Sequence, residues 1–234
     1  MNLPRISSRP EACACGATVH VVRVQRPGTA LRCDACAAEH AATTAAAAKV
    51  FRETAAVARF NGELPPRYAW ADLDAPELAV RVRPANAVER ARRLTAAGGG
   101  AVLVGPSGMG KTSLAVAMLR DLHTRATPFE RAQGFLFVSA YDLAVARSQT
   151  KLGDGEAEIV DRAMRATAIV LDDLGTEQDR YGSAVADVIH RRHDYDAVTI
   201  ATTGFGQEAI TSRYGTQVAR RLFEVSPRIT LGGK

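Results

Sequence analysis

The sequence of 234 residues contains no run of 18 consecutive apolar residues, which excludes an ordinary membrane-spanning helix. Its N-terminus also lacks the apolar segment of a secretory signal. Cysteine and lysine are scarce: the chain has four cysteines, and only four of its 30 basic residues are lysines. With neither an export signal nor a membrane segment, we expect a cytoplasmic protein with reduced thiols and no membrane partner.

The charge that is present is positive, with a net value of +5 and a pI of about 9.3. Most of it comes from arginine, which suits contacts with phosphate groups. A GC-rich genome would produce the same excess of arginine together with many alanines. The charge therefore allows a nucleic-acid partner without specifying one.

Residues 105–112 read GPSGMGKT, which has the spacing of a phosphate-binding loop, or P-loop. The apolar run 101–104 predicts the strand before the loop, and 113–123 predicts the helix after it. Lys111 would reach the β- and γ-phosphates of ATP, and the Thr112 hydroxyl would hold Mg²⁺. The predicted nucleotide-binding residues here are Gly105, Pro106, Ser107, Gly108, Met109, Gly110, Lys111, Thr112 and Ser113.

Residues 169–173 read IVLDD and predict the partner strand that such a loop needs. Asp172 would hold the magnesium, and Asp173 would polarise the attacking water, with Glu177 as a weaker candidate for that task. Because many ATPases have the longer Glu where this chain has Asp173, we expect slow hydrolysis that DNA or a partner stimulates. After the strand 198–201, Thr203 would lie between the γ-phosphate and Asp172.

The segment RYGTQVARRLFE, residues 213–224, predicts a basic helix near the end of the domain. Arg220 or Arg221 would present a guanidinium to the γ-phosphate of a neighbouring subunit and stabilise the transition state. Arg213 is the second candidate, and an ordinary basic surface helix is the alternative.

Composition divides the chain into three segments. Residues 1–40 hold all the cysteines, 41–62 form an alanine-rich helical linker, and 63–234 alternate strands with amphipathic helices, which predicts an α/β domain with a parallel sheet. Strands are expected at 101–104, 135–138, 168–171, 198–201 and 228–231. Helices are expected at 85–97, 111–125, 140–148, 156–166, 182–195, 207–213 and 215–224.

The four cysteines, Cys13, Cys15, Cys33 and Cys36, form two closely spaced pairs that suit a tetrahedral Zn²⁺ site. A segment this short buries little core, so the metal would drive its folding. Disulfides are the alternative, and His20 or His40 could replace a ligand. The strand VHVVRV would turn at Pro27–Gly28, and the basic module would touch either DNA or another protein.

Six segments together resemble the bacterial helicase-loader family of AAA+ ATPases (DnaC/DnaI type) and the related IstB-type transposase-helper ATPases. They are GELPPRYAWADLD at 62–74, GPSGMGKTSLA at 105–115, FLFVSAYDLA at 135–144, IVLDDLGTE at 169–177, IATTGF at 200–205 and SRYGTQVARRLFE at 212–224. The resemblance covers residues 63–231. It implies a P-loop AAA+ ATPase core with a minimal or absent lid, preceded by the small zinc-binding module.

The resemblance also implies that Tyr68 packs near the adenine and that the arginine finger is Arg221. It implies that the N-terminal module binds a hexameric replicative DNA helicase, that the ATPase part contacts single-stranded DNA, and that ATP binding drives self-association. Two features depart from the family. Gly204 stands where Asn is common, which shifts nucleotide sensing to Thr203. The family's sensor-2 arginine follows the last strand by a few residues, and here it is either absent or lies beyond Lys234.

These features predict an ATP-dependent loader of a replicative helicase. The first alternative is an IstB-type ATPase that coats duplex DNA and recruits a transposase. The second is a nucleotide-dependent adaptor with negligible hydrolysis, which the departures at Asp173 and Gly204 would favour.

Overall fold

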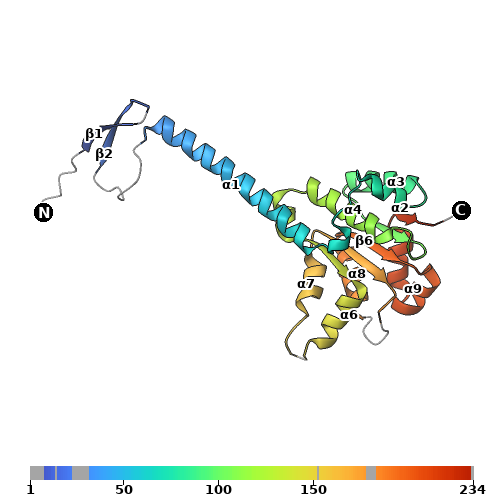
Figure 1. Ribbon diagram of the computed structural model, residues 1–234. Coiled ribbons are helices and arrows are strands. Elements are labelled where there is room, and N and C mark those ends of the chain that lie inside the picture. The colour runs from blue at the N-terminus through green and yellow to red at the C-terminus, as the bar shows by residue number, and fades with distance from the viewer. Residues whose placement is uncertain (1–7, 14, 23–31, 152, 178–182, 233–234) are drawn as a thin grey trace. The chain divides into compact units, whose positions relative to one another are not determined.

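The computed structural model describes residues 8–13, 15–22, 32–151, 153–177 and 183–232 (Figure 1). Contacts between residues divide the chain into two units, Met1–Ala56 and Val57–Lys234. The predicted boundaries at residues 40 and 62 remain predictions. None of the described helices is long and apolar enough to cross a membrane.

The N-terminal unit contains a β-hairpin and the first part of a long helix. Strands β1 (Ser8–Ala12) and β2 (Thr18–Val22) pair antiparallel, with Ala12 opposite Thr18. A short turn around Gly16, which has φ 88°, closes the hairpin. The predicted turn at Pro27–Gly28 lies outside the described residues. The helix predicted in the linker is longer than expected, since α1 covers Asp34–Glu63.

The second unit is built on a five-stranded parallel sheet with the order β4-β5-β6-β3-β7. All five strands predicted from the sequence are present, and the predicted fold class, a P-loop α/β core with a parallel sheet, is confirmed. β5 and β6 each run past their predicted ends. The strands are β3 (Ala101–Val104), β4 (Phe135–Ser139), β5 (Ala168–Leu174), β6 (Val198–Thr203) and β7 (Arg228–Thr230).

Helices cover both faces of this sheet (Figure 1) because the strands are apolar on both sides. Leu103 packs into one buried layer with α3 and α4, while its neighbour Val102 packs into the other with α6, α7 and α8. The helices are α2 (Pro76–Arg81), α3 (Asn86–Ala96), α4 (Lys111–Arg125), α5 (Pro128–Gln133), α6 (Ala140–Gln149), α7 (Glu158–Arg165), α8 (Ser183–Asp194), α9 (Gln207–Tyr214) and α10 (Thr216–Arg220).

Four elements differ from the sequence-based expectation. The 3-10 turn η1 (Pro66–Tyr68), α2 and α5 were not predicted, since each is too short to show a helical period. The helix expected at 215–224 is α10 followed by a π-helical turn, η3 (Arg221–Val225). β7 is the last element of the described residues, and the minimal or absent lid stays a prediction.

Arg192 is the largest fully buried side chain of the described residues, with 1% of its surface exposed. Its guanidinium donates hydrogen bonds to the carbonyl oxygens of Ala163, Ala166 and Val198 and to the hydroxyl of Thr199. Burial lowers its pKa to about 10. Arg192 therefore joins the end of α7 to the start of β6 through carbonyl groups instead of a carboxylate.

The end of α1, from Val57 onward, belongs to the second unit and packs there through stacked rings. Phe60 lies parallel to His123 with ring centroids 4.1 Å apart, and Phe135 meets the His123 ring edge-on at 5.0 Å. His123 is only 4% exposed, and burial lowers its pKa to about 4. The imidazole is thus neutral when the protein is folded near neutral pH.

This buried histidine predicts a loss of stability in mild acid. Because the pKa in the folded state lies below the ordinary 6.5, the unfolded chain binds the proton more readily, so stability is lost as the pH falls through that window. Between pH 7 and about pH 4, the free energy of unfolding should fall by on the order of 2 kcal/mol more in the native protein than in His123→Phe. Urea unfolding at both pH values measures this, and equal losses in the two proteins would contradict it.

Candidate functional site

The P-loop connects the carboxyl end of β3 to the first turn of α4. Gly108 and Gly110 have φ of 81° and 80°, a conformation that other residues rarely adopt, so the loop can curl with its N–H groups facing inward. The Lys111 side chain is 7% exposed, and its ammonium donates to the carbonyl oxygen of Pro106 at 2.9 Å. Together with the N-terminus of α4, this cation makes the loop a binding site for phosphate groups.

Two segments that the sequence did not identify enclose the P-loop. A Cβ atom on Gly110 would lie 3.0 Å from Cγ2 of Val82, just after α2. On the other side, a Cβ on Gly105 would lie 2.0 Å from the carbonyl oxygen of Leu231, just after β7. Gly105 therefore has no room for a side chain, and a side chain at Gly110 would be crowded as well as strained by its φ of 80°.

The structure gives the contacts of Tyr68 within the protein, and its packing near the adenine stays a prediction. Its ring lies against Phe137 of the edge strand β4, with centroids 6.4 Å apart, and Arg67 lies over it at 5.0 Å. The residue of this region that contacts the P-loop is Arg81, whose guanidinium lies 4.7 Å from the Trp70 ring centroid and whose carbonyl oxygen approaches Gly110.

Asp172, at the end of β5, faces the start of α4. Its Oδ1 accepts hydrogen bonds from the Thr112 hydroxyl at 3.0 Å and from the Thr202 hydroxyl of β6 at 2.7 Å. Burial raises the pKa of this carboxyl, and the two hydroxyls act in the opposite direction by stabilising the carboxylate. Hard oxygen donors from Thr112 and Asp172 meet at one point, as Mg²⁺ requires. When bound there, Mg²⁺ would neutralise charge on the phosphates.

Asp173 follows in an unusual conformation. Its φ is 54°, in the left-handed region that non-glycine residues seldom occupy. The Thr202 hydroxyl accepts from its backbone N–H at 2.9 Å, and the Thr176 hydroxyl donates to its carbonyl oxygen at 2.8 Å. The side chain is exposed, as a group that acts on a water molecule has to be. Its catalytic role remains a prediction.

The contact expected of Thr203 is made by its neighbour. The Thr203 hydroxyl is fully buried, donates to the carbonyl oxygen of Leu174 at 2.9 Å, and accepts from the N–H of Phe205 at 3.0 Å. Thr202 is the residue that touches Asp172. Adjacent residues of a strand point to opposite faces, so only one of the two threonines can do so.

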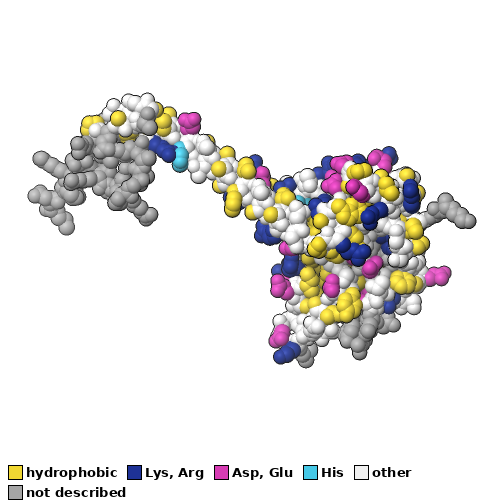
Figure 2. Space-filling model, in the orientation of Figure 1, with side chains coloured by type: hydrophobic (Ala, Val, Ile, Leu, Met, Phe, Trp, Pro, Cys, Tyr) yellow, Lys and Arg dark blue, Asp and Glu magenta, His cyan; other side chains and the backbone are white. Residues whose placement is uncertain are grey.

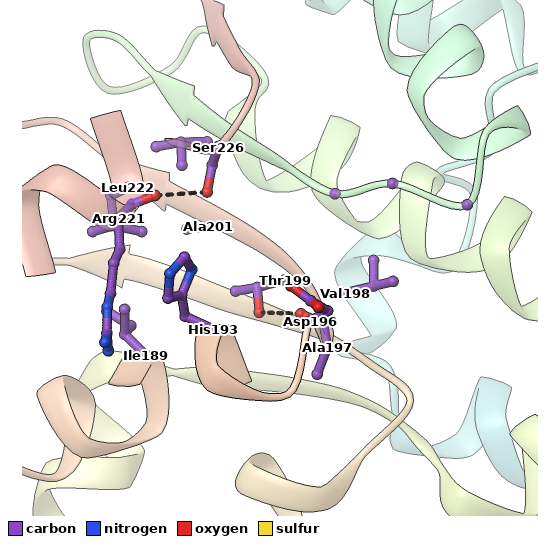
Figure 3. Close-up of a pocket in the computed structure, with 14 residues that line it drawn as sticks. Ile189, His193, Asp196, Ala197, Val198, Thr199, Ala201, Arg221, Leu222 and Ser226 are labelled. Carbon is purple, nitrogen blue, oxygen red and sulfur yellow. Dashed lines mark hydrogen bonds between the residues drawn. The ribbon is translucent and has the colours of Figure 1, made fainter. Parts of the chain in front are cut away.

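Arg221, the predicted arginine finger, is held within its own chain. Its guanidinium forms a hydrogen bond with Nδ1 of His190 and an ion pair with Asp194 at 3.0 Å, both in α8. Figure 3 shows Arg221 alongside Ile189, at a cavity of about 220 Å³ where β3 and β6 begin. This is the opposite end of β3 from the P-loop, so Arg221 is placed away from its own nucleotide site.

The two other candidate arginines differ from each other. Arg213 donates from Nε to the Glu177 carboxylate at 3.1 Å and is mostly buried. Arg220 is exposed, and it makes no side-chain hydrogen bond or ion pair with the part of the chain that the structure describes. Of the three, Arg220 is the most accessible to a neighbouring molecule.

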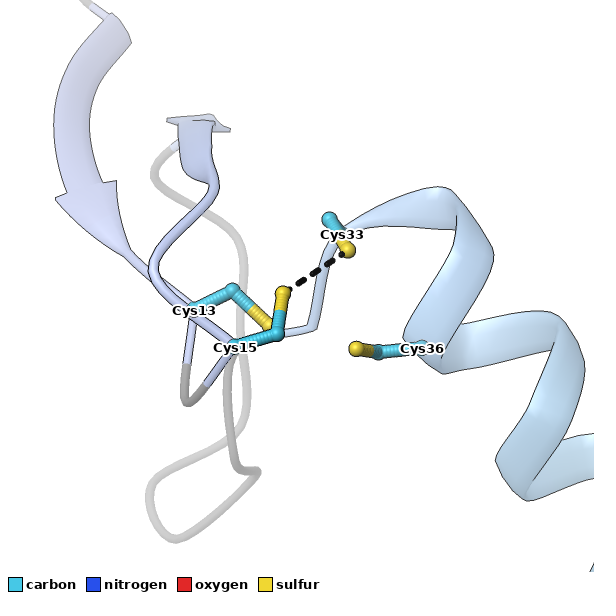
Figure 4. Close-up of side chains that lie close together, drawn as sticks. All are labelled: Cys13, Cys15, Cys33 and Cys36. Carbon is cyan, nitrogen blue, oxygen red and sulfur yellow. Dashed lines mark hydrogen bonds between the residues drawn. The ribbon is translucent and has the colours of Figure 1, made fainter.

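The four cysteines come together from the hairpin turn and the start of α1 (Figure 4), and their sulfur atoms all lie within 4.8 Å of one another. In a tetrahedron with Zn–S bonds of about 2.3 Å, the sulfurs are about 3.8 Å apart. Cys15 and Cys33 are at 3.5 Å, and no two of the four are joined. The backbone N–H groups of Cys15 and Cys33 lower the pKa of the Cys13 thiol to about 6. The donor set thus fits a tetrahedral Zn²⁺ site, and all four thiols are free in this structure.

Comparison with known proteins places the chain in a family, through a match that covers the P-loop and Asp172. Residues 90–215 match the protein-family model described as IstB-like ATP binding protein. A search by sequence among curated proteins finds no match.

Three solved structures are similar in fold. The crystal structure of the DnaC helicase loader has a TM-score of 0.61 at 22% identity, over 72% of this chain and 100% of that chain. That of DnaI has a TM-score of 0.58 at 20% identity, over 72% and 95%. The replication initiator DnaA bound to AMPPCP and single-stranded DNA has a TM-score of 0.56 at 17% identity, over 73% and 51%.

The cysteine cluster predicts about one zinc ion per chain, measured by elemental analysis of the purified protein after free metal is removed. Cys36→Ser should lower the zinc content and loosen the N-terminal unit, because four thiolates form the site. His40→Ala is the matched control and should keep its zinc, since His40 lies outside the cluster. A native protein that is well folded but contains no metal would contradict the assignment.

Proposed function

The chain belongs to the family of IstB-like ATP-binding proteins and is an AAA+ ATPase, and on this premise we propose that it loads a hexameric replicative DNA helicase onto single-stranded DNA. The observation that carries the proposal is the similarity of fold to the DnaC helicase loader over the whole of that solved chain. DnaI supports it as a second neighbour. The DnaA structure with AMPPCP and single-stranded DNA supports the choice of nucleotide and of DNA form.

In this proposal the N-terminal unit is the docking module. A separate unit with a four-cysteine cluster precedes the ATPase unit, and a zinc-stabilised surface can bind a partner without any large apolar core. Figure 2 shows Lys and Arg side chains interspersed with Asp and Glu on the drawn face of this unit, and in the proposal the basic side chains contact DNA. These two tasks, held on separate units, are what a loader needs.

The ATPase unit would act as a switch. Lys111, Thr112 and Asp172 would hold ATP and Mg²⁺, and Asp173 would orient the attacking water. ATP binding would drive self-association, since a neighbour has to complete the site with an arginine. Hydrolysis removes the γ-phosphate contacts and would release the partner. In this mechanism ATP is the only substrate, and its hydrolysis changes which molecules the protein is bound to.

The second candidate is a helper of DNA transposition. The matched family model bears the IstB name, and such a protein would bind duplex DNA and recruit a transposase. The two candidates share the ATPase site and differ in the DNA form and in the protein partner.

The proposal predicts a stable complex with the replicative helicase of the same host in the presence of ATP. The mass in solution of full-length protein mixed with helicase tests this, and Lys111→Ala should reduce complex formation because it removes the phosphate contact. Cys13→Ser with Cys15→Ser should also reduce it, through the docking module. The matched control is Lys151→Ala, which removes an exposed lysine of the second unit, outside the docking module and the P-loop. Failure to bind a competent helicase, with binding to duplex DNA instead, would favour the transposition helper.

The finger assignment predicts a difference between neighbouring arginines. Arg221→Ala should lower ATP turnover by about 10²–10³-fold while ATP binding by the single subunit is retained, because a finger acts on the transition state in the adjacent site. Arg220→Ala is the comparison. A larger loss in Arg220→Ala than in Arg221→Ala would move the finger to the exposed residue.

A further inference from the structure

Glu177 is a buried carboxylate that the ATPase mechanism described above does not use. Its side chain is 0% exposed. One oxygen accepts from the hydroxyl of Tyr214 and from Nε of Arg213, and the other accepts from the backbone N–H of Gly175 at 3.2 Å. Both oxygens are occupied within the protein, so this carboxylate is not available to activate water, the task that the sequence had left open for it.

Two of the groups that bind Glu177, the Arg213 and Tyr214 side chains, belong to the last two residues of α9. The Tyr214 hydroxyl also accepts from the N–H of Gly175, at 2.8 Å. Burial raises the pKa of Tyr214, with the Glu177 carboxylate acting in the same direction. The Arg213 guanidinium supplies the countercharge. Gly175 is therefore held by two groups that are themselves joined to each other and to α9.

Gly175 is joined in turn to the catalytic end of β5. It follows Asp172 and Asp173 by two to three residues, and Thr176, next to it, holds the carbonyl oxygen of Asp173. The Phe205 ring packs on Gly175 so closely that a Cβ there would lie 2.6 Å from it. The segment between Asp173 and Glu177 thus has little room to move independently of α9.

We propose that Glu177 is a positioning residue that couples the Asp173 end of β5 to the segment formed by α9, α10 and η3, with Arg220 at the end of α10 and Arg221 at the start of η3. A change in Asp173 when nucleotide binds would pass through Gly175 and Glu177 to Tyr214, and from there to the arginines that face another subunit. A purely structural role would not require this chemistry, because apolar residues often replace a buried ion pair without loss of stability. The proposal rests on the ATPase function of this site.

The first test compares turnover with binding. In Glu177→Gln, the amide NH₂ would face at least one of the three donors that now point at the carboxylate. We expect kcat to fall about tenfold, while the Kd for Mg·ATP stays within about twofold because the P-loop is untouched. Tyr214→Phe, which keeps the packing, should produce a smaller loss of kcat. The matched control is Glu208→Gln, an exposed glutamate in the first turn of α9, which should leave both quantities unchanged.

The second test measures the coupling between the nucleotide site and α9, and it requires only that the protein binds ATP. Hydrogen exchange of the α9 amides should change when a non-hydrolysable ATP analogue binds to the native protein, and this change should be lost in Glu177→Gln and reduced in Tyr214→Phe. If the native α9 does not respond to the analogue, or if the variants keep both the response and kcat, the proposal is overturned. Absence of ATP binding by the native protein would instead refute the proposed function. Should Glu177→Gln fail to fold, Tyr214→Phe decides alone.

Discussion

One carboxylate oxygen, Oδ1 of Asp172, holds the nucleotide site together by accepting hydrogen bonds from Thr112 and Thr202. Backbone hydrogen bonds cannot join the P-loop strand β3 to β5, which carries Asp172, because β6 lies between these two strands. The Thr202 side chain on the intervening strand bridges the gap. The same hydroxyls stabilise the charged form of a carboxyl whose pKa burial raises. The same two hydrogen bonds thus fix the position of the Asp172 carboxylate and favour its charged form.

The strained backbone at Asp173 is a consequence of this arrangement. A non-glycine residue with positive φ costs on the order of 1 kcal/mol and persists only where its surroundings fix it. Here Thr202 holds the N–H and Thr176 holds the carbonyl oxygen. The pairing of β5 with β6 shifts between Leu171 and Leu174, where the strand makes this irregular step. Asp173 is therefore exposed and yet fixed, which suits a group that orients water.

The sequence was most informative where chemistry is local. The P-loop and the apolar strand before Asp172 each fit in a few residues, and their positions follow from spacing alone. Thr202 and Thr203 could not be separated, because the face of a strand depends on register, a property of the assembled sheet. Arg192 was missed for a related reason: an arginine in a polar helix segment reads as surface, and only tertiary packing brings the carbonyls that surround it. Contacts between Arg81, Val82 and the P-loop are likewise tertiary.

A switch needs an element whose arrangement both the nucleotide and a neighbouring molecule can bias. In the proposal above, the segment from α9 to η3 is that element. Near the end of α9, Arg213 pairs with Glu177, just after β5, and Arg221, the first residue of η3, pairs with Asp194 of α8. Between them, Arg220 faces solvent, and the segment continues into a π-helical turn, a geometry that often marks functional sites. In the proposal above, a movement passed from Glu177 to α9 would change how Arg220 is presented to another subunit.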